Sequence, residues 1–395
     1  MSTTAKSTTS LVFTGDIAFD KYMDGKWEDD QLISDEVLAF LHSADHVIAN
    51  VEGPVSAYEQ DAGATGVAGL VHTIDPAAVK VFARMGADIW NINNNHIMDI
   101  GEKGLTATLA AAADFGAKTI GAGVDLDAAA VPLYLNEAGG IGMFSVGYRP
   151  RCRAAGPDHG GCLPWTETGI IRKNIEEIKS RCRWCIIVVH GGEEFTSLPS
   201  PYVRDRYISF LDMGADLVVC HHPHVPNNYE TFPGKAIFYS LGNFIFDTDY
   251  QRSQYNTEKA VLLKLNLTEE DFTFEPLGIE IQRGSERVAR GPLPAVFENV
   301  TQEEYEKLAP LAAKMFIEAT KRQHIFLFPD KFADATEDDW AANFMDPNRF
   351  ERMPGECLDF RIIYPLSLKA EEGAWKDSSL EGVKDYILAQ MGPLD

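Results

Sequence analysis

The sequence lacks an apolar run long enough to cross a membrane, and its first ten residues lack the apolar core of a secretory signal. The longest apolar runs, such as residues 185–189 and 216–220, have the length of a strand rather than the roughly 20 residues of a membrane span. We therefore expect the chain to stay in the cytoplasm without a membrane anchor. Its six cysteines are then expected to be reduced.

Basic residues are scarce as well. The chain of 395 residues has 35 Lys and Arg against 59 Asp and Glu, a formal charge of −24. Binding nucleic acid requires clustered basic side chains that neutralise phosphates, so this composition excludes nucleic acid as the main partner. A small-molecule or peptide substrate is the partner that we expect. No sequence feature indicates an oligomeric state.

Short apolar runs alternate with helix-like stretches over residues 11–245. The expected strands are 11–14, 46–49, 88–92, 141–146, 184–189, 217–220 and 236–239. The expected helices are 35–42, 76–85, 104–115, 167–181 and 201–213. This alternation predicts an α/β fold with a largely parallel sheet that is covered on both faces.

The pattern changes after Asn243. Residues 259–267 and 271–281 alternate apolar and polar side chains, which predicts an antiparallel hairpin, and residues 285–300 have the Arg, Gly and Pro content of a linker. A capping box at Thr301 opens a strong helix. We therefore divide the chain into a disordered tail (1–10), a main domain (11–283) and a mainly helical or irregular C-terminal extension that packs on the core (284–395).

Six of the expected strands end in polar or ionisable residues. These ends are Gly15-Asp16, Asn50-Val-Glu52, Asn93-Asn-Asn95-His96, His190-Gly-Gly-Glu193-Glu194, His221-His222-Pro-His224 and Gly242-Asn243. The carboxyl ends of parallel strands share one edge of a sheet, so these side chains are expected to meet there. Any one of them alone is more often a structural residue. Six independent placements point to a shared active site, because burying so many ionisable groups without a metal, a substrate or mutual pairing is costly.

Mixed nitrogen and oxygen donors of this kind suit a divalent transition metal such as Mn²⁺, Fe²⁺ or Zn²⁺. Two ions that share a carboxylate would lower the pKa of a bound water and stabilise the transition state of a hydrolysis. The residues alone leave open whether one ion, two ions or none is bound.

The same motifs, followed by Ser240-Leu-Gly-Asn-Phe244, resemble the CapA family of bacterial poly-γ-glutamate capsule-synthesis proteins (PGA_cap). That family is similar in fold to calcineurin-like metallophosphoesterases. The resemblance covers about residues 10–280, and it implies a central β-sandwich flanked by helices with the site at one edge.

The resemblance also implies roles for individual residues. Those that match metal ligands of the metallophosphoesterases are Asp16, Glu52 (in the place of their bridging Asp), Asn95, His190, His222 and His224. His96 belongs to the matching Asn-His pair. Two positions depart from the phosphoesterase pattern: Ala18 stands where a ligand His is expected, and His221 replaces a glycine.

Three functional hypotheses follow. The first is metal-dependent hydrolysis of a phosphoester or an amide, such as a γ-glutamyl bond, with His96 as the general acid. In this hypothesis Arg204 or Arg206 would hold a substrate anion. Glu193 and Glu194 are candidates for orienting His190 or binding substrate, or are solvated loop charges.

The second hypothesis is metal-independent epimerisation at the Cα of a peptide, with Asp16 paired with His224 or His96 as the two proton-transfer groups. The third is a non-catalytic subunit that binds a capsule polymer. The net charge of −24 would repel polyglutamate unless basic residues reverse the local field, which makes a polymer-binding role the last of the three.

Overall fold

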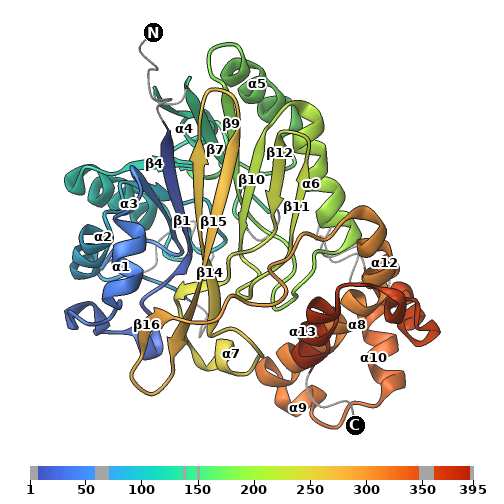
Figure 1. Cartoon of the computed structure of the whole chain (residues 1–395). Coiled ribbons are helices and arrows are strands. Elements are labelled where there is room, and N and C mark those ends of the chain that lie inside the picture. The colour runs from blue at the N-terminus through green and yellow to red at the C-terminus, as the bar shows by residue number, and fades with distance from the viewer. Residues whose placement is uncertain (1–7, 58–70, 137–138, 149–151, 347–359, 392–395) are drawn as a thin grey trace.

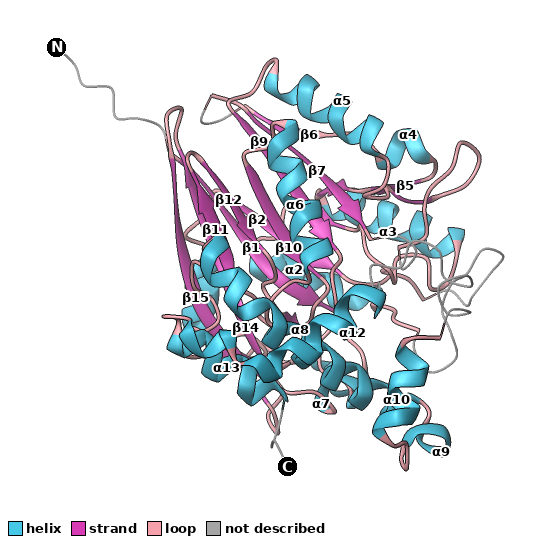
Figure 2. Cartoon of the chain, turned by 90° about the vertical axis from the view of Figure 1, so that its right-hand side faces the viewer, coloured by secondary structure: helices cyan, strands magenta, loops and turns pink. Residues whose placement is uncertain are grey.

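The computed structural model describes residues 8–57, 71–136, 139–148, 152–346 and 360–391. Two large sheets pack face to face at its centre, and helices cover the outer face of each (Figure 1, Figure 2). Leu11 and Phe13 of one sheet share a fully buried core with Ile186 and Val188 of the other. The result is the β-sandwich flanked by helices that the family resemblance implied.

The first sheet has the strand order β16-β15-β14-β1-β2-β3-β4, with β13 also paired to β1. The strands are β1 (Thr9–Ile17), β2 (His46–Val51), β3 (Ile89–Asn91), β4 (Lys118–Ile120), β13 (Asn243–Ile245), β14 (Lys259–Leu267), β15 (Phe272–Gln282) and β16 (Arg287–Arg290). β1 to β4 and β13 run parallel, whereas β14 to β16 are antiparallel. All nine residues of β1 are buried, as expected of a central strand with both faces covered.

The second sheet has the order β11-β12-β10-β9-β7-β6. Its strands are β6 (Leu133–Leu135), β7 (Ile141–Gly147), β9 (Trp184–His190), β10 (Leu217–His221), β11 (Tyr229–Phe232) and β12 (Lys235–Phe238). β7, β9, β10 and β12 are parallel, so their carboxyl ends share one edge. A small separate pair is formed by β5 (Ala122–Gly123) and β8 (Gly161–Cys162).

Helices pack on the outer face of each sheet through apolar stripes. The first sheet is covered by α1 (Asp35–Leu41), α2 (Val79–Met85) and α3 (Glu102–Phe115), and the second by α5 (Thr168–Lys179) and α6 (Pro201–Met213). The short α4 (Leu126–Ala129) and α7 (Asp249–Arg252) lie in connections. Ser200 caps α6 by accepting a hydrogen bond from the Val203 backbone N–H, and Gly214 ends the helix with a φ of 117°.

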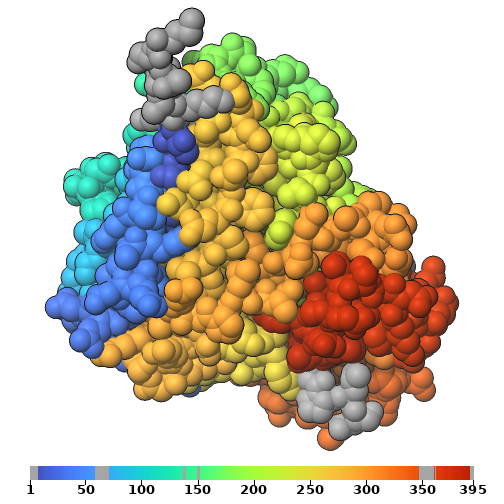
Figure 3. Space-filling view, in the orientation of Figure 1, coloured from blue at the N-terminus to red at the C-terminus, as the bar shows by residue number. Residues whose placement is uncertain are grey.

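The C-terminal extension is mostly helical where it is described. It consists of α8 (Gln302–Leu327), α9 (Pro329–Phe332), α10 (Glu337–Phe344), α12 (Phe360–Leu368) and α13 (Glu381–Met391). These helices form a lobe against the lower right of the main domain in Figure 3. Leu308 and Met315 of α8 pack with Ile387 of α13 and with Leu198 of the main domain, so the extension shares a core with it.

Three predictions need correction. The strands form two large sheets rather than the single sheet that the alternation predicted. The sequence did not separate the two arrangements, because a strand that is buried on both faces has the same apolar pattern whether a helix or a second sheet covers it. The segment predicted to be a linker contains β16, which lengthens the main domain beyond residue 283: Val288 is buried and pairs with Ile281. β1 begins at Thr9 rather than Leu11, and residues 1–7 of the predicted tail lie outside the described residues.

Candidate metal centre

The carboxyl edges of the two sheets bring the predicted residues into two facing rows. In the first sheet, Asp16 of β1 pairs in register with Asn50 of β2 and Asn243 of β13. In the second sheet, His190 of β9 pairs in register with His221 of β10. Residues that are far apart in the sequence therefore lie side by side because parallel strands end together.

Amide side chains connect these rows by hydrogen bonds. The Nδ2 atom of Asn50 donates to Oδ1 of Asp16 at 2.8 Å, and Asn91 donates to Asn50 at 2.7 Å. Nε2 of His190 lies 2.8 Å from Oδ1 of Asn95, and Asn243 Oδ1 lies 3.0 Å from Nδ1 of His224. The amides fix the orientations of the carboxylate and the imidazoles.

Glu52 stands at the centre of two groups of possible metal ligands. One group consists of Glu52, His190 and His222, and the other of Asp16, Glu52 and His224. Within each group the ligand atoms lie within 4.8 Å of one another. Glu52 Oε1 is 3.6 Å from Nε2 of His190 and 3.8 Å from Nε2 of His224, so one carboxylate serves both groups.

The buried oxygen atoms of this cluster are not satisfied by the protein. Both carboxylate oxygens of Glu52 and Oδ2 of Asp16 are buried without a hydrogen-bond partner among the described residues. Buried polar atoms are nearly always paired, and an isolated buried carboxylate is very costly. Carboxylate and imidazole donors suit Mn²⁺, Fe²⁺ or Zn²⁺, so the residues present fit a divalent transition metal.

The crowding of this cluster shifts the pKa values of its ionisable groups. Burial and the negative charge of Asp16 raise the pKa of Glu52 well above its ordinary value. Burial also acts to raise the pKa of Asp16, but the close imidazoles of His221 and His224, 3.5 and 3.2 Å from its carboxylate, outweigh it and lower that pKa. Burial acts to lower the pKa of His224, yet the charges of Glu52 and Asp16 raise it to about 9. A cation would relieve the repulsion between the two carboxylates.

The loop after β10 holds its imidazoles in an unusual backbone conformation. His222 has a φ of 100° and His224 a φ of 59°, values that L-residues rarely adopt. Such strain persists only where the surroundings enforce it, and it is concentrated at functional sites. Here it directs both imidazoles toward Glu52 from a single short loop.

His96 lies at the rim of the buried cluster. Its Nδ1 is 2.8 Å from Oδ2 of Asp99, and its side chain is 16% exposed, whereas that of Glu52 is fully buried. His72 packs edge-on against His96, with ring centroids 4.1 Å apart, and its Nδ1 is 2.6 Å from Asp20. The sequence offered no signal for His72, because it follows no predicted strand.

Other residues that the sequence did not assign also belong to the cluster. Nδ1 of His221 lies 3.5 Å from Oδ1 of Asp16, and neither of its ring nitrogens has a hydrogen-bond partner among the described residues. Asn50 and Asn243 support the ligands directly. The strand-end pattern placed these residues at the shared edge but gave them no individual role.

The two arginines predicted to hold a substrate anion lie elsewhere. Arg204 makes a bidentate ion pair with Glu230, with distances of 2.6 and 2.7 Å, and its guanidinium lies over the ring of Tyr305. It is therefore not available as a clamp. Arg206 is half-buried beside Tyr202, to whose hydroxyl it donates at 3.4 Å, and no contact connects it to the cluster in the described part of the chain.

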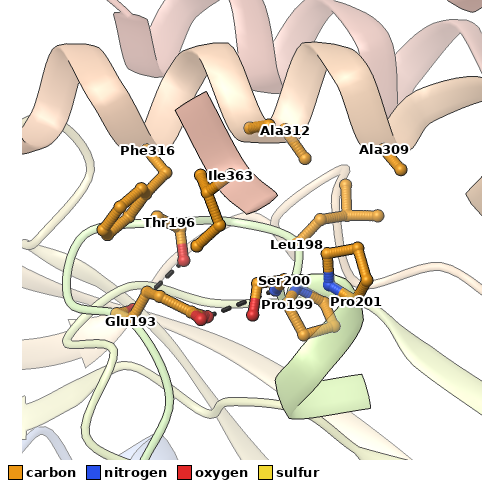
Figure 4. A pocket seen from close by; sticks show the side chains of 11 residues that line it. Glu193, Thr196, Leu198, Pro199, Ser200, Pro201, Ala309, Ala312, Phe316 and Ile363 are labelled. Atoms are coloured by element: carbon orange, nitrogen blue, oxygen red, sulfur yellow. Dashed lines mark hydrogen bonds between the residues drawn. The ribbon is translucent and has the colours of Figure 1, made fainter. Parts of the chain in front are cut away.

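The two neighbouring glutamates have different surroundings. Glu193 is buried in a small pocket between residues 193–201 and α8 (Figure 4), where one carboxylate oxygen accepts from the Ser200 backbone N–H at 3.2 Å. Burial raises its pKa to about 7. Glu194 instead faces the cluster, with Oε1 3.8 Å from Nε2 of His222. Glu194 is therefore within ion-pair distance of the His222 ring.

Residues 10–248 match the family described as bacterial capsule synthesis protein PGA_cap. This match covers more than half of the chain and includes every ligand candidate. The chain belongs to this family. This match confirms the resemblance to the family that the strand-end motifs indicated.

Three curated relatives are similar over much of this region. PGA biosynthesis protein CapA of Bacillus subtilis is 30% identical over 266 residues, which is 66% of this chain and 69% of the relative. Capsule biosynthesis protein CapA of Bacillus anthracis is 27% identical over 256 residues, 63% of this chain and 61% of the relative. A probable polyglutamine synthesis accessory protein of Mycobacterium tuberculosis is 27% identical over 229 residues, 54% of this chain and 59% of the relative.

Among solved structures, the 5'-nucleotidase of Candida albicans superimposes with a TM-score of 0.39 and 12% identity, over 69% of this chain and 52% of the nucleotidase. Within the described residues, no helix combines the length and the apolar character that a membrane crossing requires.

Proposed function

We propose that this chain is a metal-dependent hydrolase of a phosphoester or amide bond, and that Glu52 would help to hold each of two divalent ions. The observation that carries the proposal is that two ligand groups share the carboxylate of Glu52. His190 and His222 would hold one ion, and Asp16 and His224 the other. Asn95, whose Oδ1 lies 2.8 Å from Nε2 of His190, would add a ligand to the first set.

A divalent cation at this position supplies Lewis acidity and lowers the pKa of a bound water. The chain's own residues do the rest. Asn50 holds Asp16 by the 2.8 Å hydrogen bond, and Asn243 holds His224, so that the ligands are ordered before substrate arrives. His96, at the exposed rim and oriented by Asp99, would donate a proton from Nε2 to the leaving group.

An amide of the γ-glutamyl type is the first substrate class to test. The Bacillus subtilis relative is named for PGA biosynthesis, and an amine leaving group needs a proton donor such as His96. The net charge of −24 disfavours a long polyanionic polymer and favours a short peptide.

The experiment compares hydrolysis of γ-glutamyl-p-nitroanilide and p-nitrophenyl phosphate by protein purified without chelator, with added Mn²⁺, Co²⁺ or Zn²⁺. Metal should stimulate turnover of at least one substrate. Glu52→Gln should reduce it by more than about 100-fold, because it removes a ligand of both ions rather than an outer contact. Glu269→Gln, at an exposed position between β14 and β15 beside the start of β1 and so at the opposite end of that strand from Asp16, is the matched control. Wild-type protein without bound metal and without metal-stimulated hydrolysis would refute the proposal.

The epimerase hypothesis gains less support from the geometry. Nδ1 of His224 is only 3.2 Å from Oδ2 of Asp16, so the pair is in direct contact and a substrate carbon has no place between them. The epimerase hypothesis with Asp16 and His96 as the two proton-transfer groups can still be tested. The measurement is deuterium incorporation at Cα of a peptide in heavy water.

A further inference from the structure

A residue of α8 connects the C-terminal extension with the surroundings of the candidate metal centre. Gln323 donates from Nε2 to Oε2 of Glu194 at 2.7 Å, and it also contacts the hydroxyl of Tyr250. Tyr250 in turn donates to the same oxygen of Glu194 at 2.7 Å. α8 lies outside residues 10–248, the region that matches the family.

The opposite oxygen of Glu194 faces a predicted ligand. Its Oε1 lies 3.8 Å from Nε2 of His222, close enough for charge attraction and about 1 Å longer than a hydrogen bond. When one ring nitrogen of a histidine binds a metal, the other commonly donates to a carboxylate that orients the ring. Glu194 occupies that place for His222.

The segment of α8 that carries Gln323 is firmly docked. Its neighbour Arg322 donates to the backbone carbonyls of Gln390 and Met391 at 2.9 Å each, which ties α8 to the end of α13. Phe326, one turn further along α8, packs against the ring of Tyr250 at a centroid distance of 5.7 Å. Contacts with α13 and with Tyr250 of the main domain therefore hold this part of α8, and Gln323 with it, in place.

We propose that Gln323 is a positioning residue for the metal centre: it fixes Glu194, which orients His222, so that docking of α8 sets the metal affinity of the Glu52–His190–His222 group. This inference rests on the proposed metal-dependent function. It gives the C-terminal extension a role in assembling the site.

The test is a titration of metal-free protein with Co²⁺, followed by its visible absorption. In Gln323→Ala the Kd of one Co²⁺ should rise about tenfold while the other stays unchanged, because only one group contains His222. Gln302→Ala, at the exposed first turn of the same helix, is the matched control and should bind like the wild type. Circular dichroism of each variant verifies that it is folded.

A double-mutant cycle with Glu194→Gln shows whether Gln323 acts through Glu194. In that background Gln323→Ala should add no further change in Kd. Full additivity, or a Gln323→Ala protein with wild-type Kd values, would overturn this inference while leaving the proposed function intact. Wild-type protein that binds no Co²⁺ would overturn both.

Discussion

The Nδ1 atom of His96 lies 2.8 Å from Oδ2 of Asp99, three residues along the same turn. This contact leaves Nε2 as the ring atom for proton transfer. We predict that His96→Gln lowers kcat by about 10²- to 10⁴-fold on substrates with amine or alkoxide leaving groups. The loss should be much smaller on p-nitrophenyl esters, whose leaving group needs no proton.

His46→Gln is the matched control for this experiment. His46 also contacts an aspartate, Asp88, through Nδ1 at 2.6 Å, but it lies at the start of β2, at the opposite end of the strand from the site. An equal loss on all leaving groups in His96→Gln would refute its role as general acid.

The ion pair of Arg204 and Glu230 predicts a stability effect. Arg204→Ala leaves the buried carboxylate of Glu230 without its cation and with a hydrogen bond from the hydroxyl of Tyr239, and we expect it to lower the unfolding free energy by about 3–5 kcal/mol in urea denaturation. Activity per folded molecule should stay near that of the wild type. Arg206→Ala, at a half-exposed position, should cost less than about 1 kcal/mol. A raised KM in a fully stable Arg204→Ala protein would restore the anion-clamp hypothesis.

Glu193 predicts a pH-dependent stability. Burial raises its pKa from 4.5 to about 7 in the folded chain, so between these values the folded state holds a proton that the unfolded chain has lost. Stability due to this group therefore falls as the pH rises from about 4.5 to about 7. Glu193→Gln removes the titrating group. The unfolding free energy of this variant minus that of the wild type should therefore rise by up to about 3 kcal/mol between about pH 4 and about pH 8.

Thermal or urea unfolding at several pH values measures this difference. The exposed Glu269→Gln is the control and should show no such trend. A Glu193→Gln protein whose stability relative to wild type is the same at both pH values would contradict the assignment.

Much of the site could be predicted from the sequence, because parallel strands bring their carboxyl ends together whatever the details of packing. Asp16, Glu52 and His190 follow strands whose apolar runs are plain, and the structure places them in one cluster. The same reasoning did not distinguish a single sheet from two packed sheets, since the sequence of a strand that is buried on both faces does not indicate whether helices or another sheet cover it.

Contacts between distant segments were beyond prediction. The partner of Arg204 is Glu230 on β11, a strand with the short mixed sequence Tyr229–Phe232 that no periodicity indicated. Gln323 reaches Glu194 over 129 positions, and only the docking of α8 brings them together. Helix amphipathicity predicts that a helix packs, but it does not predict against which surface.

The most direct measurement is anomalous diffraction from crystals soaked in Mn²⁺. The account predicts two anomalous peaks on either side of the Glu52 carboxylate, one also contacting His190 and His222 and the other Asp16 and His224. No peak at the carboxylate, together with Mn²⁺ bound elsewhere on the chain, would contradict it.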